Sequence, residues 1–110
     1  MPFARLSDLA HFSPEKMQKN PILDCPQMVA DVYCLEPGQE QRVHAHAGEA
    51  KMYCVVDGRG DFTIGDASRT LAAGEIAWSP AGVVHGVRNA YAERLTVLVV
   101  MAPNPNLRRE

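Results

Sequence analysis

The sequence predicts an all-β domain, an antiparallel sandwich or barrel, with a short helical segment at its N-terminus. From Met28 onward, about eight short segments alternate apolar and other residues with period two, as strands do. Turn signals built from glycine, proline, asparagine and aspartate separate these segments, and no long helical pattern occurs among them. The 110 residues are 46% hydrophobic and 22% charged, which indicates one domain with a core of its own.

The first stretch of the chain carries the helical signals. Apolar residues recur at helical spacing between Phe3 and Ala10, which predicts a short helix there. Ser13, Pro14 and Glu15 then have the order of cap, first helical position and first-turn acid. We therefore expect a second short helical piece to begin at this point.

Two prolines mark the expected start of the barrel domain. Pro21 and Pro26 interrupt the stretch after the helical signals, because each removes a backbone donor. We assign residues 1–24 to an N-terminal helical or extended segment that packs on the barrel, and residues 25–110 to the barrel domain. Within the latter, the polar residues from 103 onward are expected to be an untethered tail.

The strands are placed by their alternation and by the turns between them. Asp57 and Gly58 suit the left-handed dihedral angles of a tight hairpin, and Pro37 with Gly38 ends the first strand. We expect strands at 28–35, 41–47, 51–56, 61–64, 69–72, 76–78, 83–88 and 94–101.

Charge and cysteine content exclude several classes of partner and compartment. A net charge of −2 gives no basic surface for nucleic acid, and no apolar run reaches the ~18 residues of a membrane helix. The N-terminus lacks the apolar core and cleavage site of a signal peptide. Cys25, Cys34 and Cys54 show no CxxC spacing, so we expect reduced thiols in a cytoplasmic protein.

Two histidines one residue apart are the main chemical signal. His44 and His46 lie on the same face of an extended strand, because side chains alternate with period two. With His85 from a neighbouring strand, they predict a three-imidazole site for a divalent transition metal. Such a site suits Fe, Mn, Ni, Cu, Co or Zn and leaves coordination positions open for a ligand. The fourth histidine, His11, is given no role.

Two spaced motifs carry a resemblance to a known family. The second motif runs Gly74, Pro80, Gly82, His85 and Asn89; the first runs Gly38, His44, His46 and Gly58. The chain resembles the cupin superfamily, in particular its small single-domain bacterial members. The resemblance implies an antiparallel double-stranded β-helix, also called a jelly roll or cupin barrel. It also implies that the three histidines are the metal ligands.

Lys51 is the departure from this pattern, since the resemblance implies a glutamate ligand at its position. At ~6 Å and an effective dielectric constant of ~20, an ammonium and a divalent ion would repel each other by about 5–6 kcal/mol. Four outcomes are open: Lys51 swings away, loses its proton, pairs with Glu49, or marks a site that has lost tight metal binding. Glu49 is also a possible fourth ligand, if the loop after His46 bends toward the ion.

Arg42 and Tyr53 complete the candidate pocket with Lys51. In regular strands both would share the interior face with the histidines, where they can hold a carboxylate or enolate oxygen. The plainer alternative gives Tyr53 a packing role and leaves Arg42 as a solvated charge at the rim. No phosphate-binding glycine loop or nucleophile elbow is present.

These features leave three functional interpretations. The first is a metal-dependent enzyme of dioxygenase, isomerase or decarboxylase type acting on a small oxygenated molecule. The second is a non-enzymatic cupin that binds a small ligand or senses it, and the third is an inert relic. The resemblance implies a homodimer, and 28–35, apolar on both faces apart from Asp31, is compatible with one.

Overall fold

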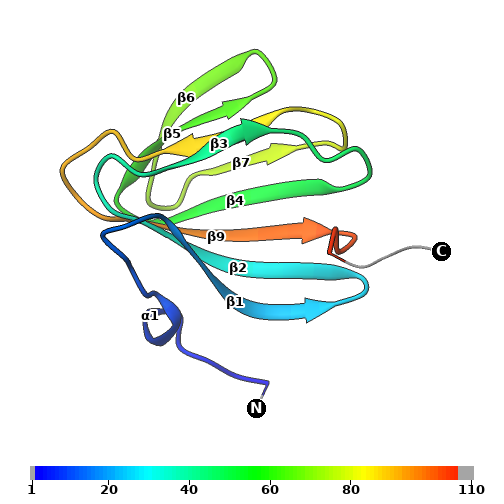
Figure 1. The fold of residues 1–110 in the computed structure, drawn as a ribbon, viewed down its shortest axis with the longest axis horizontal. Coiled ribbons are helices and arrows are strands. Elements are labelled where there is room, and N and C mark those ends of the chain that lie inside the picture. Colours follow the sequence, from blue (N-terminus) through cyan, green and yellow to red (C-terminus); the bar gives the residue numbers. More distant parts are fainter. Residues whose placement is uncertain (1, 107–110) are drawn as a thin grey trace.

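A computed structural model describes residues 2–106 and confirms an all-β fold with a short N-terminal helix. Two antiparallel sheets make up the molecule, and Figure 1 shows the strands of each lying side by side. One sheet has the order β1-β2-β9-β4-β7 and the other β3-β8-β5-β6. The elements are α1 (Leu6–Leu9), β1 (Gln18–Cys25), β2 (Met28–Leu35), β3 (Glu40–His44), β4 (Ala50–Asp57), β5 (Arg59–Ile64), β6 (Ala67–Ala72), β7 (Ile76–Ser79), β8 (His85–Arg88) and β9 (Leu95–Ala102).

All eight expected strands are present, and a ninth was missed. β1 pairs with β2 from Gln18 opposite Cys34 to Cys25 opposite Met28, with an irregularity after Pro21. Most of its residues are exposed, so no alternation of apolar side chains marks it in the sequence. The five-stranded sheet therefore begins at Gln18, inside the segment of residues 1–24 that we had expected to pack on the barrel as a helical or extended piece.

The helical expectation at the N-terminus was only half right. α1 is a single turn, and the residues after Ser13 form a bend, so the second helical piece does not form. The Ser13 hydroxyl accepts the backbone N–H of Glu15 at 3.2 Å, as a cap would, but no helical turns follow. A capping signal alone did not suffice because no apolar helical face follows it.

The beginning of the expected tail is held against the sheet. Asn104 is buried, and its side-chain amide donates hydrogen bonds to the carboxylate of Asp24 and to the carbonyl of Cys25. Its backbone N–H also reaches the carbonyl of Pro26. The expectation of an untethered tail is therefore wrong for this stretch, while residues 107–110 lie outside the described part of the chain.

The core fills the space between the two sheets. Inward side chains of both sheets meet there, as period-two alternation requires. The buried cluster comprises Tyr33, Leu35, Tyr53, Val55, Phe62, Leu71, Val87, Leu95, Val97 and Val99. The remaining interior, at the end where β3 stops and β8 starts, is polar and contains the histidines.

Asn89 fastens the strands that carry the histidines to the rest of the barrel. Its buried side-chain amide donates to the carbonyls of Leu35 and Glu93, at 3.0 and 2.8 Å. Its backbone carbonyl accepts the N–H of Gly38 at 2.7 Å, and its own N–H reaches the carbonyl of Gln39. The first residue of one motif is thereby bonded to the last residue of the other.

Candidate metal centre

The backbone brings the three histidines of the two motifs together. His44 ends β3 and pairs with His85, the first residue of β8. His46 lies two residues beyond β3, and its carbonyl accepts the N–H of Gly82 at 2.8 Å. One potential ligand atom from each of the three side chains lies within 4.8 Å of the others. Ligands around one ion lie about 3–4 Å apart at bond lengths near 2.1 Å, so the cluster is close to coordinating geometry.

Each imidazole is oriented by an oxygen at its Nδ1 atom. These contacts are His44 to the carbonyl of Arg42 at 2.8 Å, His85 to the carbonyl of Val83 at 3.1 Å, and His46 to the carboxylate of Glu49 at 3.5 Å. A carbonyl only accepts, so Nδ1 of His44 and Nδ1 of His85 carry the proton and their Nε2 atoms keep the lone pair. This is the arrangement that commonly orients metal-ligating histidines.

The Nε2 atoms face one another without other partners. Nε2 of His85 is buried and has no hydrogen-bond partner among residues 2–106. Nε2 of His44 lies 3.2 Å from Nε2 of His46. Two lone pairs at that distance repel unless a proton or cation lies between them. An ion about 2.1 Å from both would see them at an angle of roughly 100°, which suits tetrahedral or octahedral coordination, so the residues fit a metal.

Burial keeps two of these rings neutral near pH 7. Loss of solvent, with a smaller contribution from the positive charge of Lys51, lowers the pKa of His85 to about 4 against the opposing effect of its hydrogen bond to the Val83 carbonyl. Burial likewise lowers the pKa of His46, as do the neighbouring His44 and Lys51. A neutral imidazole is the form that ligates a metal.

A bulge in β3 overturns the expected position of Arg42. The register with β8 shifts between Gln41 and His44, so these two residues share the interior face although three positions separate them. Arg42 is exposed and Gln41 is buried in its place. Gly86 permits the bulge, because a Cβ there would lie 2.9 Å from the carbonyl oxygen of Gln41.

Lys51 is buried inside the barrel and turns to Tyr33 rather than to Glu49. Its ammonium donates to the Tyr33 hydroxyl at 3.1 Å, and it is only 2% exposed. The nitrogen also lies 5.0 Å and 5.1 Å from the ring centroids of Tyr33 and Tyr53. Burial lowers the pKa of Lys51 to about 7. One of the four expected outcomes was an ion pair between Lys51 and Glu49. The contacts of the described residues contain no such pair, because the carboxylate of Glu49 faces His46 instead.

Tyr53 points into the barrel, as alternation predicted, and belongs to a buried polar chain. Its hydroxyl donates to Oε1 of Gln41 at 2.8 Å, and Nε2 of Gln41 donates to the hydroxyl of Tyr33 at 3.1 Å. Burial raises the pKa of both phenols. The ring of Tyr53 lies 6.2 Å from that of His85, so this chain borders the cluster.

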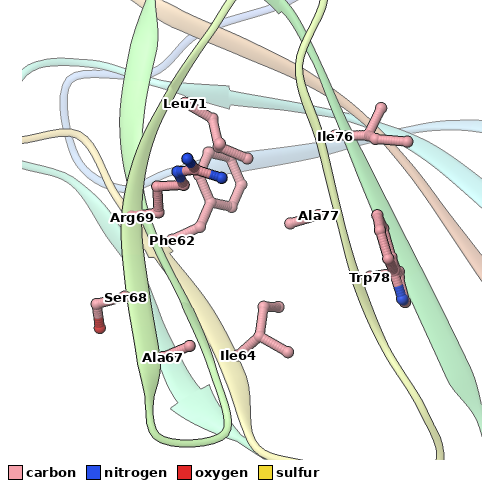
Figure 2. Close-up of a pocket in the computed structure, with 9 residues that line it drawn as sticks. All are labelled: Phe62, Ile64, Ala67, Ser68, Arg69, Leu71, Ile76, Ala77 and Trp78. Atoms are coloured by element: carbon pink, nitrogen blue, oxygen red, sulfur yellow. The ribbon is translucent and has the colours of Figure 1, made fainter.

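A hollow of about 300 Å³ opens between the two sheet edges. Figure 2 shows Phe62 and Ile64 of β5 with residues of β6 on one side and Ile76, Ala77 and Trp78 of β7 on the other. Ile64, one of the residues that line this hollow, pairs with His85 in the β5–β8 register, so the hollow adjoins the centre at that residue. The three histidines do not line it.

Sequence reasoning missed two residues of this site, Gln41 and Tyr33. Gln41 was missed because a regular strand would turn it outward, and the bulge depends on Gly86 in another strand. Tyr33 fits the sequence pattern only as part of an apolar strand, although its hydroxyl joins Lys51 to Gln41. The only hint of the bulge in the sequence was the glycine at position 86, directly after the candidate ligand His85.

Comparison with known proteins agrees with this architecture. The family model described as "Cupin domain" matches residues 31–101. An uncharacterized protein from Streptomyces coelicolor, SCO3923, is 36% identical over 76 residues, which are 69% of this chain and 70% of that protein.

Solved structures extend the likeness over nearly the whole chain. TT1209 from Thermus thermophilus is 43% identical with a TM-score of 0.91, over 94% of this chain and 98% of that one. A conserved Klebsiella pneumoniae protein with a double-stranded β-helix domain is 26% identical, with a TM-score of 0.86 over 93% and 90%. In residues 2–106 no helix has the length and apolar character to cross a bilayer. The fold, the paired motifs and the family match together show that the chain belongs to the cupin family.

Proposed function

We propose that His44, His46 and His85 bind one divalent transition metal and that the protein is a metal-dependent enzyme acting on a small oxygenated molecule. The observation that carries this proposal is the convergence of three nitrogens, with the rings of His44 and His85 held by hydrogen bonds through the opposite nitrogen. When bound, the ion would polarise an oxygen of the ligand at the positions that the histidines leave open. The donor set suits Fe, Mn, Ni, Cu, Co or Zn.

Lys51 is the residue best suited to move a proton in this centre. Its pKa of about 7 lets it give or accept a proton near neutral pH, which general acid–base catalysis requires. The hydroxyl of Tyr53 is committed to Gln41, and its pKa is raised, so it stays a protonated donor. We propose that the reaction is of one of three types: isomerisation, decarboxylation or dioxygenation of a small molecule.

Glu49 supports the centre from behind His46 and is not proposed as a ligand. Its carboxylate lies 3.5 Å from Nδ1 of His46, and it does not belong to the cluster of mutually close ligand atoms. A carboxylate in this position raises the basicity of the ligating ring and fixes its tautomer.

Metal analysis of protein purified without chelator or nickel resin tests the proposal. About one equivalent of ion per chain is expected, and His85→Ala should lose it. His11→Ala is the matched control, because His11 is exposed and lies outside the cluster. Metal content that His85→Ala leaves unchanged would refute the site. A non-enzymatic sensor would still bind its small molecule after chelation, whereas the enzyme would lose turnover.

We also propose that the protein forms a homodimer through the outer face of the five-stranded sheet. Residues in register across strands share a face, and two rows of apolar side chains result. The rows are Val100, Met52 and Trp78, and Leu98, Cys54 and Ile76. Met52, Ile76 and Trp78 are 41%, 49% and 62% exposed, and no charged side chain interrupts the rows, which supports a second copy as the partner.

The cysteines support a cytoplasmic location for this activity. Cys25, Cys34 and Cys54 are all free thiols in the structure. Cys34 is buried, and burial raises the pKa of its thiol, which keeps it unreactive. Free thiols are the usual state of cysteines in a reducing compartment.

A further inference from the structure

We propose that Lys51 and Tyr33 form an anion-binding subsite beside the three histidines, so that the ligand of this centre is a small carboxylic acid bearing two negative charges. Some of its oxygens would occupy the open positions on the ion, and the others would accept hydrogen bonds from Lys51 and Tyr33. The inference rests on the proposed metal site and names the class of molecule that the site takes.

The strand pairing places Lys51 next to the cluster. Lys51 lies opposite Ser79 in the β4–β7 pair, and paired residues face the same side of a sheet. The hydroxyl of Ser79 lies 3.2 Å from Nδ1 of His85. The stem of Lys51 therefore starts on the same interior face as Ser79, which contacts a proposed ligand.

The two side chains together have more donors than the protein has acceptors for them. An ammonium has three N–H groups, and among the described residues only the hydroxyl of Tyr33 accepts from Lys51. That oxygen also accepts from Gln41, so the hydroxyl hydrogen of Tyr33 has no acceptor within residues 2–106. Both side chains are 2% exposed, which makes unused donors costly. A ligand that consists mainly of acceptor oxygens would satisfy them.

The charges around the centre lead to the same class of ligand. Lys19 is a second cation, with its nitrogen 5.4 Å from the ring centroid of Tyr33. Asp31 and Glu49 are the carboxylates that act on this group of residues, and in the described chain neither forms an ion pair with Lys51. With Lys51 protonated, a divalent ion and the two lysines carry four formal positive charges against two negative ones, an excess of two, and Lys19 is exposed to solvent.

The environment of Lys51 supports this interpretation. Its pKa falls to about 7 because burial, together with the repulsion of Lys19, outweighs the attraction of Asp31. A bound dianion would supply the missing charge. Charge-assisted hydrogen bonds to carboxylate oxygens are among the stronger ones in proteins.

Titration of the zinc-loaded protein with oxalate tests the proposal. Oxalate chelates an ion with two oxygens and leaves two outer oxygens for Lys51 and Tyr33. Calorimetry should show that Lys51→Met binds oxalate at least ~10-fold more weakly than the wild type, the effect of losing one charged hydrogen bond. The affinity of Lys51→Met for acetohydroxamate, which chelates an ion with a single negative charge, should fall by less than ~3-fold. Lys16→Met removes an exposed lysine and should leave oxalate affinity unchanged.

The outcomes separate this inference from the proposed metal site. Failure of the wild type to retain zinc refutes the site, and the subsite with it. Retained zinc with oxalate affinity that Lys51→Met does not change refutes the subsite alone. Equal weakening of oxalate and acetohydroxamate also refutes it, since that result indicates a general loss of structure. If Lys51→Met does not fold, Tyr33→Phe takes its place, with weaker oxalate binding expected and unchanged binding refuting the subsite.

Discussion

A Cβ atom on Gly86 would lie 2.9 Å from the backbone nitrogen of Val43, at the bulge of β3. The bulge turns Gln41 and His44 to the same interior face. The position of His44, a proposed ligand, therefore depends on a glycine, which has no side chain, at position 86 of the neighbouring strand. The closest atoms to that Cβ belong to backbone, which cannot move away as a flexible side chain does.

Gly86→Ala is therefore expected to weaken both folding and metal binding. Overpacking of this kind costs about 1–3 kcal/mol, and it should displace His44 from the other two imidazoles. Urea denaturation and a competitive zinc titration measure the two effects. Gly48→Ala is the control, because a Cβ there meets nothing within 4 Å. Normal zinc affinity in Gly86→Ala would contradict the dependence on the bulge.

Lys51 should make the stability of the metal-free protein rise with pH above neutrality. Its pKa is about 7 in the folded state and near 10.5 when unfolded, so between these values only the unfolded chain holds the proton. The free energy of unfolding should increase by about 2 kcal/mol from pH 7 to pH 9, and the dependence should flatten below pH 7.

The contribution of this group is measured as a difference between variants. Urea denaturation of EDTA-treated wild type and Lys51→Met at both pH values cancels the titration of other residues. The control variant Lys16→Met should show the same increase in the free energy of unfolding between pH 7 and pH 9 as the wild type. An identical increase in Lys51→Met would show that the buried amine is not its source.

Asn89→Ala is expected to cost about 2–4 kcal/mol of stability, because it leaves the carbonyls of Leu35 and Glu93 without their donor. The first of these bonds is fully buried, so water cannot replace the amide there. Thermal and urea unfolding measure the loss, and Asn106→Ala, at an exposed site, is the control. A loss of stability below about 0.5 kcal/mol, the usual range of surface substitutions, would contradict the structural role of the Asn89 hydrogen bonds.

Replacing the exposed apolar rows should separate the proposed dimer. Met52→Lys combined with Ile76→Lys places two charges on the outer face of the five-stranded sheet, which a second copy cannot bury without cost. Sedimentation at micromolar concentration should change from a dimer to a 12.1 kDa monomer. Val84→Lys, a comparably exposed valine away from these rows, should remain dimeric. A wild-type monomer would refute the interface.

The sequence by itself determined the eight strands from β2 to β9 and the residues of the proposed metal site. Period-two alternation and turn residues act over a few positions, so they can be read without knowledge of distant partners. The spacing of His44 and His46 and the motif around His85 are equally local. Their meeting in space followed from the resemblance to the family.

Only the tertiary structure decided β1, the bulge and the direction of Lys51. β1 contains Pro21 and mostly exposed residues, and it becomes a strand because the free edge of β2 offers it backbone partners. Arg42 faces solvent because a register shift opposite Gly86 reverses the alternation. Lys51 turns to Tyr33 because burial and the hydroxyl on β2 set its position, and neither can be read from its own strand.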